Sequence, residues 1–93
     1  MLRDNREEGG GLPRVRLYAT LKKAAGFRET EIEAGTVEEL LEHLSVLCEG
    51  RLERYLESGI VLVNNRNISS MQGKATPLRP GDTVSVYPPV AGG

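Results

Sequence analysis

The sequence predicts an α+β fold, a mixed sheet of about four to five strands with one main helix packed on one face. Short segments near both ends of the chain have apolar residues at alternate positions, which is the pattern of half-buried strands. One longer segment between them, residues 36–48, has apolar residues at the spacing of a helix instead. At 93 residues the chain is expected to form a single domain with a modest core.

The first two predicted strands form a wide hairpin. Residues 14–19 place Val15 and Leu17 on one face and polar side chains on the other. Residues 28–33 alternate again, with a glutamate at every second position. Residues 20–27 lie between them and predict a short turn or a single helical turn that is ended by a glycine.

The main helix begins with a capping box. Thr36 is the predicted N-cap and Glu39 follows three residues later, so that each side chain satisfies a backbone amide. An apolar stripe follows, and Gly50 is the expected C-terminal stop. A second short helix is expected at about residues 51–57. The stripe consists of Val37, Leu40, Leu41, Leu44, Leu47 and Cys48.

Residues 60–76 are predicted to hold a strand, a turn, a brief further strand and a loop. Residues 60–63 are continuously apolar and too few for a helix of normal length, which favours a central strand. Residues 64–67 predict a turn, because asparagine tolerates left-handed backbone geometry. Residues 68–70 are interpreted as a brief strand, and residues 71–76 as a polar loop.

The last predicted strand, residues 83–87, follows a Pro-Gly turn. Alternation places Val84 and Val86 inward, and Ser85 and Tyr87 outward. This strand needs a partner within the sheet, and the first strand is the natural candidate. The resulting order of strand, strand, helix, strand, brief strand and strand is that of the β-grasp fold.

The chain is expected to have three parts: a flexible leader, a folded domain and an extended tail. Residues 1–13 are charged and glycine-rich and lack the apolar surface that would offset their loss of entropy, so we expect a flexible leader. Residues 14–87 form the β-grasp domain. Residues 88–93 form an extended tail, because Pro88 and Pro89 remove backbone donors and fix φ.

The tail ends in the carboxylate of Gly93, and neither Gly92 nor Gly93 has a side chain. From Pro88 onwards it can reach roughly 20 Å, at about 3.3 Å for each extended residue. Tyr87 lies at its root on the outer face of the sheet. An aromatic side chain there favours a partner interface, where tyrosine is enriched. The alternative is an edge tyrosine that covers its own sheet.

The composition argues against nucleic acid and membranes as partners. The net charge is −1, so no overall field attracts the chain to an anionic surface. No apolar run approaches the length of a membrane span. A single cysteine, Cys48, fits a reducing compartment and no signal peptide is visible, which together predict a cytoplasmic protein. Acidic residues are concentrated in residues 29–57, with basic residues on both flanks.

Other candidate chemistry has little support. His43 lies beside the apolar stripe, with no second ligand or nucleophile to pair with it. Cys48 ends the stripe, where a free cysteine packs as a small hydrophobe, and a part in sulfur relay is the minor alternative. The glutamates lack metal-ligand spacing, and the glycines at residues 9–11 follow no strand, so neither predicts a metal site or a phosphate loop.

Several segments resemble the ubiquitin-like sulfur carriers that end in Gly-Gly, and among them the small subunit of molybdopterin synthase. The resemblance covers residues 14–93, and Pro-Pro-Val-Ala-Gly-Gly directly after the last strand is its most specific part. Lys22 and Lys23 stand where the family often has Arg-Glu, and Tyr87 stands where it often has Phe. The matching segments are residues 17–19, 21–26, 36–41, 63–64, 78–84 and 87–93.

The resemblance implies an activity for the tail. An E1-like enzyme would adenylate Gly93 with ATP, and a sulfur donor of the cysteine desulfurase or rhodanese type would convert the acyl-adenylate to a thiocarboxylate. The thiocarboxylate would deliver sulfur to a pterin precursor inside the large subunit of the synthase. ATP would be used by the activating partner, while the chain itself would bind no cofactor and no metal. The residues that would enter the partner's channel are Pro88, Pro89, Val90, Ala91 and Gly92.

The same tail fits other functions. A ubiquitin-like protein modifier would form an isopeptide bond through Gly93. A sulfur carrier would serve thiamin synthesis or tRNA thiolation by the same chemistry, although Pro-Pro is less common in the thiamin branch. In the simplest alternative the chain is an interaction domain whose tail is incidental.

Overall fold

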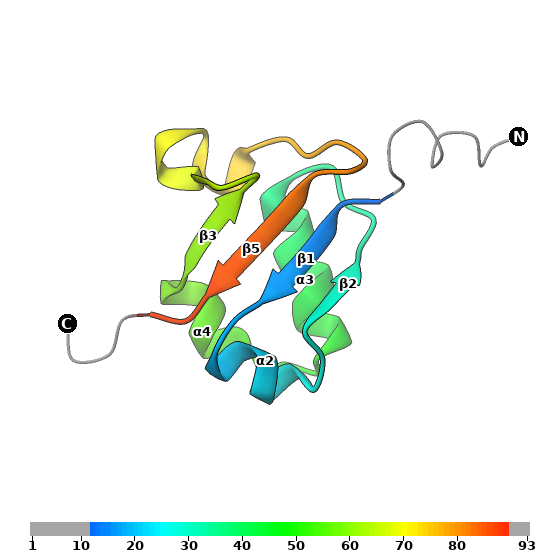
Figure 1. Ribbon diagram of the computed structural model, residues 1–93, viewed down its shortest axis with the longest axis vertical. Coiled ribbons are helices and arrows are strands. Elements are labelled where there is room, and N and C mark those ends of the chain that lie inside the picture. Colours follow the sequence, from blue (N-terminus) through cyan, green and yellow to red (C-terminus); the bar gives the residue numbers. More distant parts are fainter. Residues whose placement is uncertain (1–11, 90–93) are drawn as a thin grey trace, which may run out of the picture.

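A five-stranded sheet forms the centre of the computed structural model, which describes residues 12–89 (Figure 1). The strands lie in the order β2-β1-β5-β3-β4. This mixed sheet with one main helix confirms the predicted α+β, β-grasp fold. In chain order the elements are β1 (Arg14–Leu17), α2 (Thr20–Ala25), β2 (Glu29–Glu31), α3 (Val37–Leu47), α4 (Glu53–Ser58), β3 (Ile60–Val63), β4 (Arg66–Asn67), the 3-10 turns η1 (Ile68–Ser70) and η2 (Gly73–Ala75), and β5 (Thr83–Tyr87).

The central strand is β5. It runs parallel to β1, with Val15 opposite Val84 and Leu17 opposite Val86, and antiparallel to β3 on its other side. The predicted pairing of the first and last strands is therefore confirmed. The prediction that residues 60–63 form the central strand is wrong, because β5 is the middle strand of the five and β3 is second from the edge, with only the two-residue strand β4 beyond it.

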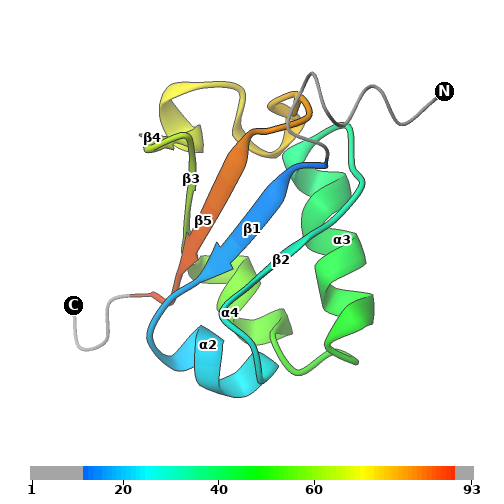
Figure 2. The ribbon, with the colours of Figure 1, turned by 45° about the vertical axis from the view of Figure 1, so that its right-hand side comes forward.

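Burial alternates along β3, although its sequence is continuously apolar. Val61 and Val63 are buried, whereas Ile60 is 37% exposed and Leu62 is half-buried. Both views of the ribbon show α3 and α4 on one face of the sheet and no helix on the other (Figures 1 and 2). An apolar run in this sheet therefore does not mark a strand that is covered on both faces.

Ser85 was expected to point outward, and it is only 5% exposed. The register places Arg16 of β1 on one side of it and Leu62 of β3 on the other. A central strand has a neighbour on both sides, so longer side chains from those neighbours cover a short one between them. Alternation gave the correct face for Ser85 and the wrong exposure.

The core lies between the sheet and the helices. Its contribution to stability comes from apolar surface removed from water. Aliphatic side chains form it, since the chain has no tryptophan and few other aromatic residues. Its most deeply buried members are Val15, Leu17, Leu21, Val37, Leu40, Leu44, Cys48, Leu52, Val84 and Val86.

The start of α3 has the predicted capping interactions, with one change. Thr36 is the N-cap, and its Oγ1 accepts a hydrogen bond from the Glu39 amide at 3.2 Å. The Glu39 carboxylate accepts from the Gly35 amide at 2.7 Å, one residue earlier than in the usual capping box. The backbone around the cap is also held from outside the helix, because the Val37 amide donates to the Thr76 carbonyl.

The segment after β3 differs from its prediction. Asn64 and Asn65 both have positive φ, of 50° and 73°, so they alone make the hairpin turn and the return strand already begins at residue 66. The Asn67 side chain then accepts from the Ser69 amide at 2.9 Å and starts a 3-10 turn. Residues 68–70, predicted as a brief strand, form that turn instead.

The N-terminal boundary of the domain is described only in part. Residues 1–11 of the predicted leader lie outside the described residues. Of its last two residues, Leu12 is half-buried and Pro13 is buried, and the Pro13 carbonyl accepts from the Ile32 amide at 3.0 Å. Within residues 12–89, no helix has the length and apolar character needed to cross a membrane.

Replacing Thr36 by alanine removes the side-chain acceptor at the start of α3. We expect the free energy of unfolding to fall by about 1 kcal/mol, as for other lost N-caps, when it is measured by urea denaturation. Thr36→Ser keeps a hydroxyl group and should stay close to the unaltered chain. An alanine variant as stable as the serine variant would show that the cap contributes nothing.

Candidate functional site

The candidate site begins where the sheet ends. The last pair in the β3–β5 ladder joins Ile60 to Tyr87, and the following residue, Pro88, has no amide to extend it. Pro88 is half-buried and Pro89 is exposed. The predicted tail residues Val90, Ala91, Gly92 and Gly93 lie outside the described residues.

Tyr87 is stacked on a second tyrosine at the root of the tail. The ring centroids of Tyr18 and Tyr87 are 4.3 Å apart and the rings are inclined by 10°. Both tyrosines are half-buried. Tyr87 therefore covers part of its own sheet and is also partly open to solvent. The Tyr18 amide donates to the Val86 carbonyl at 3.2 Å, which ties the end of β1 to the end of β5.

Tyr18 is a residue that the sequence analysis did not select. Two of its predictions together held part of the signal: residue 18 points outward from the first strand, and the first strand is the partner of the last. Parallel neighbours end at the same edge of a sheet, so the outward tyrosines that close β1 and β5 must meet.

The chain leaves β1 through a strained residue. Ala19 has φ 54° and ψ −129°, a conformation that L-residues other than glycine seldom adopt. Its carbonyl accepts hydrogen bonds from the amides of Lys22 and Lys23, at 3.1 and 3.4 Å, in the first turn of α2. Such strain persists only where the surrounding structure imposes it. Here the stacked Tyr18 on one side and α2 on the other hold the turn.

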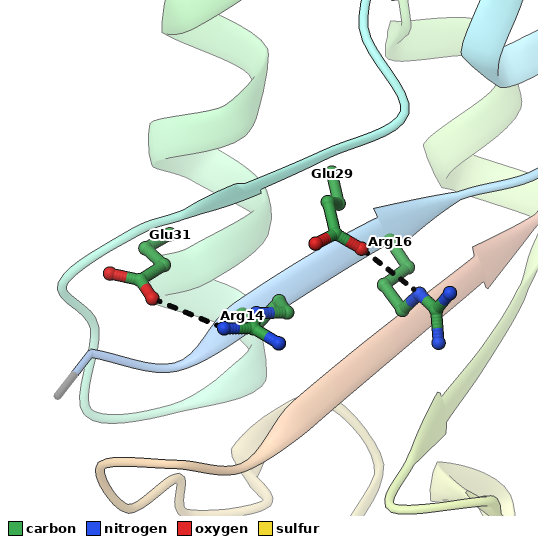
Figure 3. Close-up of polar contacts among 4 residues, drawn as sticks. All are labelled: Arg14, Arg16, Glu29 and Glu31. Carbon is green, nitrogen blue, oxygen red and sulfur yellow. Dashed lines mark hydrogen bonds and ion pairs between the residues drawn. The ribbon is translucent and has the colours of Figure 1, made fainter. Parts of the chain in front are cut away.

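The open face of the sheet has a charged half and an uncharged half. On β1 and β2, Arg14 pairs with Glu31 at 3.5 Å and Arg16 pairs with Glu29 at 3.3 Å (Figure 3). These exposed pairs are worth little stability, about 0–1 kcal/mol each. In these pairs, two arginines from the basic flank before residue 29 neutralise two glutamates of the acidic segment, residues 29–57.

The uncharged half adjoins the tail. It contains Ile60, 37% exposed, directly opposite Tyr87 in the register and on the same face. We call Tyr18, Ile60 and Tyr87 the tail-root patch. Aromatic side chains are enriched at protein interfaces, so the patch is suited to contact another protein.

The pKa of the Tyr87 hydroxyl is raised above its ordinary value. Partial burial is the main cause, and the neighbouring Tyr18 hydroxyl adds to it. A nearby guanidinium group, that of Arg16, acts in the opposite direction. The folded chain therefore favours the neutral phenol more than the unfolded chain does.

The other candidate residues lie elsewhere. His43 is exposed, and its Nδ1 is 3.0 Å from the Glu33 carbonyl oxygen. Cys48 is fully buried in the core, as predicted, and burial raises the pKa of its thiol, which disfavours the reactive thiolate. In residues 12–89, no three His, Cys, Asp or Glu side chains gather in a way that could hold a metal ion.

A shallow hollow lies between α3 and α4. Its lining includes four glutamates, Glu38 and Glu42 from α3 and Glu53 and Glu57 from α4, together with one base, Lys74 of η2. The leucines at its floor are nearly covered, at 6% and 9% exposure for Leu41 and Leu56 respectively. The hollow belongs to the helical side of the molecule, whereas the tail-root patch is on the open face of the sheet.

Known sequences place the chain in a family. The ThiS family model matches residues 15–93. Small archaeal modifier protein 3 of Haloferax volcanii is 35% identical over 88 residues, which cover 85% of this chain and 96% of that protein. A protein of Archaeoglobus fulgidus, provisionally described as a sulfur carrier, is 36% identical over 87 residues, with 86% and 97% covered.

Solved structures agree. The small archaeal modifier protein 1 of Methanosarcina acetivorans matches with a TM-score of 0.77 and 26% identity, over 89% of this chain and 97% of that one. A chain in the complex of subunits 1 and 2 of the molybdopterin-converting factor from Helicobacter pylori matches with a TM-score of 0.63 and 26% identity, over 87% and 97%. The predicted ubiquitin-like fold and the predicted resemblance are confirmed.

Tyr18→Phe removes the hydroxyl group that helps to raise the pKa of Tyr87 and keeps the ring that covers it. We expect the pKa of Tyr87 to fall toward its ordinary value, measured from the ¹³Cζ chemical shift during an alkaline titration. The folded chain holds the Tyr87 proton more tightly than the unfolded chain does, and this difference adds to the free energy of unfolding. The added stability is fully present below the ordinary tyrosine pKa. It is lost as the pH rises through the folded-state pKa. Tyr55→Phe is the control, and an unmoved Tyr87 in Tyr18→Phe would contradict the coupling.

Proposed function

The chain belongs to the ThiS family of ubiquitin-like sulfur carriers and modifiers, and we propose that it carries sulfur as a thiocarboxylate on Gly93 for the synthesis of molybdopterin. The end of β5 is the observation that carries this proposal. The ladder stops at Tyr87, and two prolines lead from the tail-root patch toward a C-terminal Gly-Gly within the matched region.

The carboxylate of Gly93 is a poor electrophile until it is activated. In the proposed reaction, one of its oxygens attacks the α-phosphate of ATP in an E1-like enzyme, and pyrophosphate leaves. A persulfide sulfur held by a donor of the cysteine desulfurase or rhodanese type attacks the acyl carbon and displaces AMP. A thiol reductant then cleaves the remaining S–S bond and leaves the thiocarboxylate on the chain.

The thiocarboxylate then acts as a nucleophile toward a pterin precursor in the large subunit of the synthase. The likeness to a chain from a two-subunit molybdopterin-converting factor supports this partner. The chain would act as the sulfur-donating subunit, and the large subunit would bind the acceptor and supply the acid and base groups.

The tail residues suit entry into a narrow channel. Pro88 and Pro89 restrict the free tail and so lower the entropy cost of ordering it. Val90 and Ala91 can fill small apolar pockets, and a side chain at Gly92 or Gly93 would obstruct the passage. In this proposal the tail-root patch holds the partner at the channel entrance, as predicted for Tyr87.

A second candidate function is protein modification. The similarity to small archaeal modifier protein 3 over nearly the whole of both chains favours it. The adenylated Gly93 would then be attacked by a lysine amine of a target protein, with AMP leaving and an isopeptide bond forming. Both functions require the same first step.

Incubation of the full chain with its E1-like enzyme, ATP and a sulfur donor should exchange one oxygen of Gly93 for sulfur. Intact mass spectrometry measures the exchange, and a variant that lacks Gly93 should show none. Adenylation without any sulfur exchange, together with isopeptide bonds from Gly93 in cell lysate, would favour the modifier function instead. Unchanged cofactor synthesis and protein modification after deletion of Gly92 and Gly93 would refute both.

Tyr87→Ala removes the aromatic side chain of the tail-root patch that is next to the tail. We expect the KM for the chain in adenylation to rise about thirty-fold, since truncating an aromatic hot spot costs about 2 kcal/mol. ATP–pyrophosphate exchange measures it. Tyr87→Phe keeps the ring and should have nearly the original KM. Equal KM values for the alanine and phenylalanine variants would mean that the ring makes no contact with the enzyme.

A further inference from the structure

We infer that Gly59 is a positioning residue for the tail, because its missing side chain lets the end of α4 lie against the Tyr87 carbonyl and so fixes the direction in which Pro88 leaves the sheet. The consequence for activity rests on the proposed function. The packing itself does not, and it can be tested separately.

Gly59 lies at the corner between α4 and β3, one residue before the Ile60–Tyr87 pair. A Cβ atom built there would lie 2.6 Å from the Tyr55 carbonyl oxygen and closer still to the Tyr87 carbonyl oxygen. The backbone of Gly59, with φ −79° and ψ 179°, is extended and open to any residue. Glycine is therefore required here for space and not for conformation.

The two oxygens belong to backbone, so no flexible side chain can move aside. The Tyr55 carbonyl is part of α4, which is anchored by the buried side chains of Leu52 and Leu56. The Tyr87 carbonyl is at the last paired residue of β5, and Pro88 beyond it has no amide to pair. Of the two neighbours, the root of the tail is held less firmly and should be the one that yields.

To reach ordinary van der Waals distance from a methyl group at residue 59, the Tyr87 carbonyl must move away by about 1 Å. Pro88 and Pro89 have fixed φ and would transmit that displacement into the tail. The stacked Tyr18 holds the ring of Tyr87 on the open face, so the tail-root patch should change little. The expected defect is therefore in the delivery of the carboxylate and not in docking.

The test compares full-length Gly59→Ala with Gly35→Ala. Gly35 is the matched control, because a Cβ there meets only the Glu39 carboxylate at 3.5 Å, an ordinary contact, at the start of α3. In ATP–pyrophosphate exchange with the E1-like enzyme we expect Gly59→Ala to lower kcat about a hundred-fold, the loss that a misplacement of about 1 Å can cause. Its KM should stay near that of the unaltered chain, and Gly35→Ala should match the unaltered chain in both constants.

A second measurement needs no variant and no enzyme. In the unaltered full chain, the Cα–Hα residual dipolar coupling of Pro88 should fit the alignment tensor of residues 14–87, because the root of the tail is fixed to the sheet. Urea denaturation checks that Gly59→Ala is folded under the assay conditions. If it is not folded, the coupling of Pro88 decides the inference alone.

The outcomes separate the two claims. The inference would be overturned if the residual dipolar coupling of Pro88 did not fit the alignment tensor of residues 14–87. It would also be overturned by a folded Gly59→Ala variant with unchanged kcat. Failure of the unaltered chain to be adenylated would overturn the proposed function, while a Pro88 coupling that fits the tensor would still support the packing role of Gly59.

Discussion

The parallel pairing of β1 with β5 is the constraint on which the rest of the structure depends. Val15 lies opposite Val84 and Leu17 opposite Val86, so the two ends of the domain share one core. Because parallel strands end at the same edge, this pairing also brings Tyr18 to Tyr87 and the start of α2 to the start of the tail. The same contacts that stabilise the fold therefore assemble the candidate site.

Covering the sheet on one face gives the domain two different surfaces. The helices lie on one face of the sheet (Figure 2) and cover its apolar side chains. The open face carries cross-strand ion pairs on β1 and β2 and, at the root of the tail, the tail-root patch. The described residues form a platform that presents the tail. In the proposed function the reacting atoms are those of a C-terminal carboxyl group, and the partner supplies the catalytic groups.

Sequence reasoning succeeded where the signal is local. The cap at Thr36, the stripe of α3 and the outward side of Tyr87 each depend on residues a few positions apart. Leu47 is the exception in the stripe, since it was predicted to share the buried face and is 54% exposed. It failed where distant segments decide the outcome: the burial of Ser85 depends on both neighbouring strands, and the stack on Tyr18 depends on the parallel register. Gly59 follows the second short helix that was expected at about residues 51–57, and local sequence could not show its role because its spatial conflict is with Tyr87, 28 residues away in the sequence.

The carrier and modifier functions make the same demands on this platform. Both need Gly93 to be adenylated, so both need a docking patch, a stiff root and a narrow tail. They diverge only when AMP is displaced, by a persulfide sulfur in one case and a lysine amine in the other. Neither nucleophile comes from this chain in the proposed reactions, so the choice between them is made by the partner that holds the adenylate. In both proposed reactions the tail-root patch and Gly59 act before that choice, so this platform does not itself decide between a carrier and a modifier.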